Sequence, residues 1–265
     1  MTPRRANGIA LLVTCEHGGN RVPSAYRRWF VNADDALASH RGFDAGALTM
    51  ARRLSHTLNG TLLFTTVSRL VVELNRSLRH PQLFSSFLRS APEEVRREIF
   101  ERYYVPYWTA AQAAVDRALR GYARVVHIGS HSFTPVLDGR TRTADIGLLY
   151  DPARPHEASL CAHWREALRR RAPAWRVRRN YPYAGKNDGL TTALRRRYSP
   201  SRYLGIEIEI NQLHPLGPGA SWRAMQRTVI AALSEALDAE TPVRRERNSR
   251  DTAPTHNQSR LEDRR

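Results

Sequence analysis

Short apolar runs of strand length alternate along the chain with longer segments whose apolar residues recur every three or four positions. The first pattern predicts buried strands, and the second predicts helices with one buried face. Strands are expected over residues 8–15, 61–66, 125–130, 146–150, 174–179 and 203–211, with a further strand or an extended segment over 70–74. Helices are expected over residues 24–30, 47–58, 156–171 and 221–238, with a long helix from about 93 towards 122 and a short one from about 190. This alternation predicts an α/β fold in which helices cover both faces of a mixed, largely parallel sheet.

Local signals mark the ends of several helices. Asp44 lies just before an apolar pattern of helical spacing, which places it at or near the N-cap of that helix. Residues 90–93, Ser-Ala-Pro-Glu, form a capping box with proline in the first turn of the following helix. Pro106 lies inside the same helical pattern and is expected to kink or break it, because proline has no backbone N–H to donate.

The chain has neither an internal repeat nor a linker before its last residues. A single domain is therefore expected over residues 1–240. Residues 241–265 are rich in proline, arginine and serine without periodicity, so they are expected to form a disordered basic tail.

No apolar run approaches the length of a transmembrane helix, and the first residues lack the apolar region of a secretory signal. These features predict a cytoplasmic protein with no membrane partner. Its only cysteines, Cys15 and Cys161, indicate neither a disulfide framework nor a cysteine-rich zinc site.

The formal net charge of the 265-residue chain is +17, a value typical of proteins that bind nucleic acids. The distribution of the charge argues against that function. Lys186 is the only lysine among 42 basic residues, the arginines are spread along the whole chain, and no basic motif is interleaved with aromatic residues. We therefore expect no specific nucleic-acid partner, although the charge favours weak binding to polyanions. A non-enzymatic, nucleic-acid-associated protein stays open as an alternative, and it predicts salt-sensitive binding without a metal requirement.

Four titratable residues occupy comparable places in the predicted sheet. They are His17 after the first strand, Asp44 before a helix, His131 after the strand over 125–130, and Glu209 on the strand over 203–211. In a wound α/β sheet such positions meet at one edge. Two histidines and a carboxylate form an open zinc site with a position left for water. Glu209 is then the candidate general base, which accepts a proton from water and passes it to the leaving amine.

Each of these residues also has a purely structural interpretation. His131 can be a hydrogen-bonded core histidine, and Asp44 can cap a helix. Glu207 and Glu209 can pair with arginines. No two candidate ligands are local, as they are in a His-Glu-x-x-His motif, so spacing alone does not identify the site. A single metal site accounts for all four residues together, and we favour that interpretation.

Several short motifs resemble those of the N-formylglutamate amidohydrolase family. The resemblance extends from about Leu11 to Gln212 and depends on the order and number of the motifs. The motifs are CEHGGNRVP at 15–23, FDAGA at 43–47, ELNR at 73–76, HSF at 131–133, DIG at 145–147, NYPYAG at 180–185 and EINQ at 209–212. The resemblance implies a three-layer α/β/α sandwich of the phosphorylase/hydrolase-like type. It also implies metal-assisted hydrolysis of an N-acylated amino acid, with N-formyl-L-glutamate and water giving formate and L-glutamate as the type reaction.

The family looks related to zinc-dependent cell-wall amidases and zinc carboxypeptidases, which implies one zinc ion per chain. The pattern of the amidases assigns the ligands to His17, Asp44 and His131. The carboxypeptidases take their first ligand pair from His-x-x-Glu, and here the fourth position of that motif is Asn20. Either Asp44 or Glu16 therefore supplies the carboxylate ligand. We prefer Asp44, because alternation along the strand directs Glu16 away from His17.

The named substrate carries two carboxylates, so its site needs fixed cations. The planar guanidinium of arginine suits this role, and Arg76 and Arg142 lie in or beside matched motifs. Either could instead stabilise the oxyanion of the tetrahedral intermediate together with zinc. Asn180 and Tyr183 lie in a loop that could close over the substrate or simply form a packed turn. A zinc amidase or carboxypeptidase acting on another small peptide or amide is the alternative enzyme.

Overall fold

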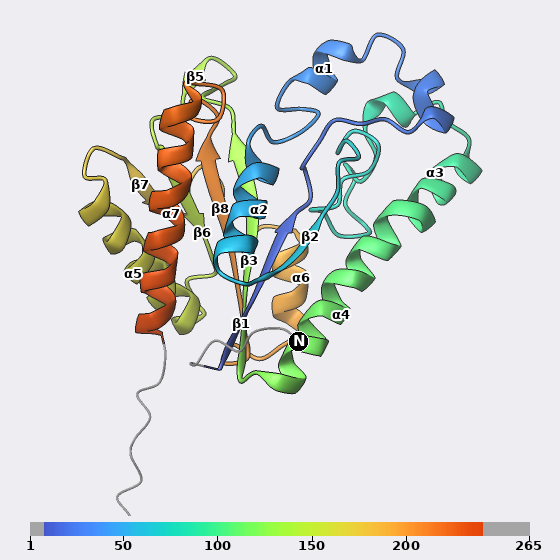
Figure 1. The fold of residues 1–265 in the computed structure, drawn as a ribbon. Coiled ribbons are helices and arrows are strands. Elements are labelled where there is room, and N and C mark those ends of the chain that lie inside the picture. Colours follow the sequence, from blue (N-terminus) through green and yellow to red (C-terminus); the bar gives the residue numbers. More distant parts are fainter. Residues whose placement is uncertain (1–7, 241–265) are drawn as a thin grey trace, which may run out of the picture.

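The computed structural model describes residues 8–240, which fold around one six-stranded sheet with the strand order β2-β1-β3-β8-β6-β7 (Figure 1). β6 runs antiparallel to β8, and every other neighbouring pair in this sheet is parallel. The predicted mixed, largely parallel sheet is thus confirmed. The strands are β1 (Ile9–Cys15), β2 (Thr61–Phe64), β3 (Arg124–Phe133), β6 (Ile146–Leu149), β7 (Val177–Arg179) and β8 (Tyr203–Asn211). The hairpin of β4 (Val136–Leu137) and β5 (Arg140–Thr141) is separate from this sheet.

Helices cover both faces of the sheet and create two hydrophobic clusters, so the three-layer α/β/α architecture is confirmed as well (Figure 1). One face packs against α2 (Ala47–Thr57), α5 (Pro155–Arg171) and α7 (Gly219–Ala239). The other packs against α4 (Val105–Gly121) and α6 (Leu190–Arg197). Alternation along β1 explains both layers, because Leu11 and Val13 face the first cluster while Leu12 faces the second.

Shorter elements complete the fold around the upper end of the sheet in Figure 1. They are the 3-10 helices η1 (Ser24–Trp29) and η2 (Ser86–Leu88), and the helices α1 (Asp34–Ala38) and α3 (Glu93–Ile99). No helix within residues 8–240 has the length and apolar character needed to cross a membrane. The tail expected over residues 241–265 lies outside the described residues.

Three expectations about local structure were wrong. Residues 70–74 form turns and irregular structure rather than a strand. α3 has Pro92 at its N-cap position and no side-chain cap, so Ser90 does not form the expected capping box. Of the expected kink or break at Pro106, the break is wrong, because a π-helical turn, η3 (Phe100–Tyr104), joins α3 to α4 directly before it. There the N–H of Val105 donates to the carbonyl of Phe100, five residues back, and Pro106 falls in the first turn of α4, where its missing N–H costs little.

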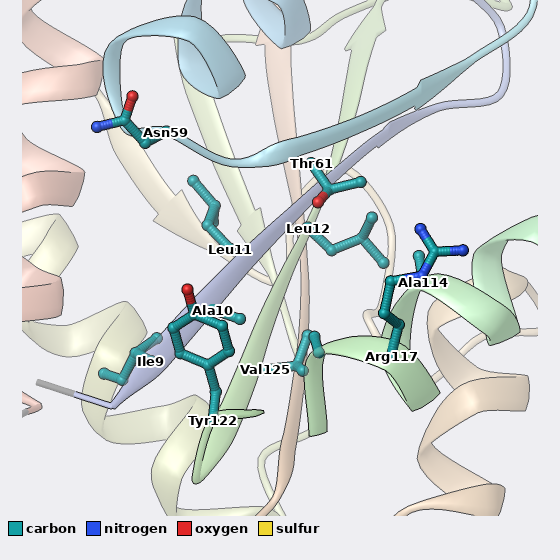
Figure 2. A pocket seen from close by; sticks show the side chains of 11 residues that line it. Ile9, Ala10, Leu11, Leu12, Asn59, Thr61, Ala114, Arg117, Tyr122 and Val125 are labelled. Carbon is teal, nitrogen blue, oxygen red and sulfur yellow. The ribbon is translucent and has the colours of Figure 1, made fainter. Parts of the chain in front are cut away.

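The carboxyl ends of β1, β3 and β8 lie together at one edge of the sheet. These three strands are adjacent and parallel, and the register pairs His131 of β3 with Glu209 of β8. The opposite end of β1 carries only a small cavity of about 80 Å³. Figure 2 shows its lining, which includes Ile9, Leu12 and Val125 together with Arg117. The buried titratable side chains of Glu16, His17, Asp44, Glu73, His131 and Glu209 lie instead at the carboxyl edge, where the sequence predicted a site.

Candidate active site

His17 is fixed by a tight turn directly after β1. A Cβ atom on Gly18 would lie 2.6 Å from the carbonyl oxygen of Thr65, and one on Gly19 would lie 2.8 Å from the carbonyl oxygen of Thr66. The turn therefore needs glycine at both positions because it packs directly on the chain that follows β2. His17 is 2% exposed. The two glycines thus bring the imidazole into the protein interior rather than leaving it in a solvated loop.

Asp44 approaches both candidate histidines from the loop before α2. Its Oδ2 atom lies 3.2 Å from Nδ1 of His17 and 3.0 Å from Nδ1 of His131. Asp44 lies near the N-cap of α2, as expected, but it does not cap the helix, since Gly46 occupies the N-cap with a φ of 80° and no side chain caps the helix. The backbone N–H of Asp44 donates to the carbonyl of His17, which holds the loop against the turn after β1. The carboxylate is thus directed at the imidazoles.

The far nitrogen of each imidazole faces a further carboxylate. Nε2 of His17 is hydrogen-bonded to Oε1 of Glu73. Nε2 of His131 lies 3.2 Å from Oε2 of Glu16, without the alignment of a hydrogen bond, so both atoms lack a formal partner. Carboxylates in this position orient a metal-binding imidazole and fix its tautomer. The arrangement directs the two Nδ1 atoms and Asp44 towards one point.

The charges around these imidazoles match a divalent cation. Although burial opposes ionisation, the close contact with His131 and the positive charge of that ring lower the pKa of Glu16 to about 2. Burial is likewise outweighed at Asp44 and Glu73, where the positive charges of the histidines and of Arg69 hold the pKa well below its usual range. Arg69 contacts Asp44 at 3.3 Å and Glu73 at 2.6 Å. Three carboxylates and one guanidinium leave two negative charges when the imidazoles are neutral.

The donor set also fits a metal ion. One ligand atom from each of His17, Asp44 and His131 can be chosen so that all three lie within 4.8 Å of one another, and all three residues are buried. Two imidazoles and a carboxylate are typical of open zinc sites. Glu16 lies 3.2 Å from His131 and accepts a hydrogen bond from the Tyr107 hydroxyl. The geometry therefore favours Asp44 as the carboxylate donor and gives Glu16 a place behind His131.

Glu209 lies beside this group as a buried carboxyl without a full set of partners. Burial raises its pKa to about 8; the charges of Asp44 and Glu207 act in the same direction, while His131 acts against them. Its Oε2 atom has no hydrogen-bond partner among the described residues. Glu209 also lines a cavity of about 160 Å³ together with the two histidines and Asp44. A carboxyl that is protonated near neutrality and faces a cavity is suited to acid–base chemistry.

The structure brings some of the predicted substrate-binding residues to this cavity. Arg76 and Tyr183 line it. Arg142 lies at its mouth, where Nη1 donates to the Tyr183 hydroxyl at 3.1 Å and the guanidinium lies over the Tyr183 ring. Asn180 is not part of the lining, because its Oδ1 accepts the backbone N–H groups of Tyr150 and Gly185 at 3.0 Å. Asn180 therefore shapes the loop that carries Tyr183.

Sequence reasoning assigned no role to Arg69 or Glu73. Both contact site residues that are distant in the sequence: Glu73 bonds His17, 56 positions away, and Arg69 contacts Asp44, 25 positions away. The ELNR motif was the available signal. Its first residue contacts His17, its third bonds across to Glu207 and the N–H of Leu190, and its fourth lines the cavity. All three polar residues of that motif thus belong to the site.

Comparisons with known proteins also indicate a hydrolytic enzyme. Residues 9–214 match the family model described as N-formylglutamate amidohydrolase. The structure is similar to that of the gene product Atu2144 from Agrobacterium tumefaciens, at 30% sequence identity, a TM-score of 0.73 and coverage of 88% of this chain and 92% of that one. It is also similar to an N-formylglutamate amidohydrolase from Ralstonia eutropha JMP134, at 21% identity, a TM-score of 0.65 and coverage of 89% and 96%. No curated protein matches the chain.

Proposed function

Because the chain belongs to the N-formylglutamate amidohydrolase family, we propose that it is a zinc-dependent hydrolase that cleaves the amide bond of an N-acylated amino acid. The type reaction is the hydrolysis of N-formyl-L-glutamate to formate and L-glutamate. The observation that carries the proposal is the buried His17–Asp44–His131 group, with the carboxyl of Glu209 beside it in one cavity.

His17 Nδ1, Asp44 Oδ2 and His131 Nδ1 are the proposed ligands of one zinc ion per chain. When bound, zinc supplies Lewis-acid polarisation of the scissile carbonyl and lowers the pKa of water. Glu16 and Glu73 orient the imidazoles from behind and keep each Nδ1 free to bind. Iron, cobalt and manganese also accept imidazole and carboxylate ligands, so they are the alternative ions.

Glu209 is the proposed catalytic acid–base group. Its carboxylate accepts a proton from the attacking water, and the resulting acid donates that proton to the amide nitrogen as the C–N bond breaks. A pKa of about 8 favours the protonated form at neutral pH. A cation bound nearby would stabilise the carboxylate and bring its pKa towards the working range. The Glu209 carboxyl can then both accept the proton from water and donate it to the amide nitrogen.

Arg76 and Arg142 are the proposed partners of the substrate carboxylates. Within residues 8–240, only Nη1 of Arg76 is engaged, by the carbonyl oxygens of Asn75 and Asp188, which leaves the other guanidinium nitrogens for a carboxylate. Arg76 is also the nearest candidate for stabilising the oxyanion, since it lines the cavity. Tyr183 encloses the substrate from the mouth, and Asn180 acts by shaping its loop. A peptide or another small amide is the alternative substrate.

Metal analysis and formate release from N-formyl-L-glutamate test this function together. We expect about one zinc per chain, and loss of both metal and activity in His17→Ala and His131→Ala. Glu209→Gln should keep the metal and lose roughly 10²- to 10⁴-fold in kcat. The matched control is His127→Gln, which changes another buried histidine of β3, the strand that carries His131, outside the site. It should keep both the metal and the activity. Activity retained in all three site variants would refute the assignment.

A further inference from the structure

A second hollow adjoins the candidate active site on the far side of Arg69. It has a volume of about 650 Å³, and four arginines line it: Arg41, Arg69, Arg89 and Arg96. We call it the arginine groove. Arg69 lines both this groove and the cavity with the two histidines, and its ion-pair partner Glu73, which bonds His17, lines the groove beside it. The groove is far larger than an N-formyl group requires.

Two of the four arginines in the groove are paired with carboxylates, and two are not. Arg69 is held by Asp44 and Glu73, and Arg96 is held by Glu93 and by backbone carbonyls. The guanidinium groups of Arg41 and Arg89 are exposed and make no hydrogen bond or ion pair with a described residue. Two free cations facing one hollow favour an anionic ligand there.

An unpartnered hydroxyl points to the same place. Among the described residues only four buried side-chain polar atoms lack a hydrogen-bond partner, and three of them belong to Glu16, His131 and Glu209 of the candidate active site. The fourth is Oγ of Ser85, which lines the arginine groove. Buried polar atoms without a partner are costly, and a ligand in the groove can satisfy this hydroxyl only if the Ser85 side chain turns towards it.

Positive charge also connects the groove to the mouth of the active site. His40 is half-buried, and its pKa is lowered by burial and by the charges of Arg142, Arg69 and Arg41. Arg142 lies at the cavity mouth beside Tyr183, whereas Arg41 lines the groove. Arg41 and Arg142 thus both lie close enough to His40 for their charges to act on it, one from the groove and one from the cavity mouth, while Asp44 acts in the opposite direction.

We propose that the arginine groove binds the acyl part of substrates larger than N-formyl amino acids and selects an acyl part that carries a carboxylate. A peptide with an acidic residue before the scissile amide is such a substrate. The inference rests on the proposed function, in which Arg76 and Arg142 hold the amino-acid part and leave the groove for the acyl part. Hydrolysis then breaks the C–N bond and forms a C–O bond from water; the nitrogen takes a proton from that water and leaves as the free amine of the amino acid, and the acyl part is released as a carboxylate. Leu70, Phe84 and Leu88 in the lining provide apolar contact for the peptide chain.

Two isosteric peptides test the selection for charge. N-acetyl-L-glutamyl-L-glutamate and N-acetyl-L-glutaminyl-L-glutamate differ by one carboxylate in the acyl part. For the metal-loaded wild-type protein we expect kcat/KM to favour the first peptide by about tenfold, and the preference to shrink at high salt because the arginines are exposed. In the double variant Arg41→Gln/Arg89→Gln the preference should fall to about one. Arg97→Gln, which changes an exposed arginine of α3 outside the groove, should keep it.

The outcomes separate this inference from the proposed function. Formate release from N-formyl-L-glutamate together with equal turnover of the two peptides would overturn the groove alone. An equal loss of both peptide activities in the double variant would overturn it too. If no compound is hydrolysed, the proposed function fails, and calorimetry of peptide binding to the metal-loaded Glu209→Gln protein decides the groove. Tighter binding of the acidic peptide, lost on Arg41→Gln/Arg89→Gln, would support it, and equal binding would refute it.

Discussion

His127 should make the stability of the protein depend on pH in a way that one substitution removes. This β3 residue is fully buried between the hydroxyl of Thr14, at 2.8 Å, and the hydroxyl of Tyr203, at 2.6 Å. One hydroxyl can donate and the other can accept, so the neutral imidazole satisfies both. Burial therefore lowers the pKa of His127 to about 4. In the unfolded chain a histidine has a pKa of about 6.5.

Between these two values the unfolded chain binds one more proton than the folded protein. The free energy of unfolding then decreases as the pH falls, by about 1.4 kcal/mol per pH unit. A difference of about 2.5 pKa units corresponds to roughly 3 kcal/mol lost between neutral pH and pH 4, with little further loss from this residue below that. In His127→Gln this contribution disappears, while the lost hydrogen bonding costs about 1 kcal/mol. The variant should be less stable than wild type at pH 7 and more stable at pH 4.5.

Urea unfolding monitored by circular dichroism measures this inversion. A chelator in all samples keeps metal release from contributing, and the titration of the site carboxylates cancels in the difference between the two proteins. His56→Gln, which changes an exposed histidine of α2, is the control and should follow the wild-type curve. A difference in unfolding free energy between wild type and His127→Gln that is independent of pH from 7 to 4.5 would refute the reasoning.

Two further substitutions test buried carboxylates, one behind the cavity and one beside the start of β8. Glu16→Gln removes the carboxylate behind His131 and should weaken zinc binding about 10- to 100-fold in a competition titration, with all three proposed ligands intact; unchanged affinity would contradict the orienting role. Glu157→Gln removes the charge that faces the buried guanidinium of Arg195 at 3.0 Å and should lower the unfolding free energy by roughly 3–5 kcal/mol in urea. Exposed Glu166→Gln on the same helix is its control and should stay near wild type, whereas an equal effect of both would contradict the argument.

The sheet was predictable because its central strands carry local strand patterns. β1 and the first part of β3 are nearly continuous apolar runs, and in β8 three isoleucines at positions 206, 208 and 210 alternate with polar residues. Residues 70–74 have the same apolar character but form turns, since Val71 and Val72 are buried in the second cluster without pairing to a strand. Local composition cannot distinguish these two ways of being buried.

The candidate site was predictable only in part, for a related reason. Strand ends and helix starts located His17, Asp44 and His131, because the rule for wound sheets concerns backbone position. The partners of their side chains depend on which distant segment fills the space behind each ring. Glu16 illustrates this. Alternation along the strand predicted that it points away from His17, but it could not predict that Glu16 lies against His131 of β3. Arg69 likewise enters through a turn that no periodicity predicts.

The loop that carries Tyr183 is tied down along most of its length. Asn180 binds the N–H of Gly185, Arg195 donates to the carbonyl of Gly185, and Asp188 accepts both a guanidinium and a backbone N–H from residues 76 and 77. Such a loop cannot swing open as a lid without breaking its bonds to α6 and to the segment of residues 76 and 77. The Tyr183 side chain is 42% exposed, and its hydroxyl bonds only to Arg142. We therefore expect entry and product release to be controlled by rotation of that ring, on the nanosecond timescale of side chains rather than the slower timescale of loop closure.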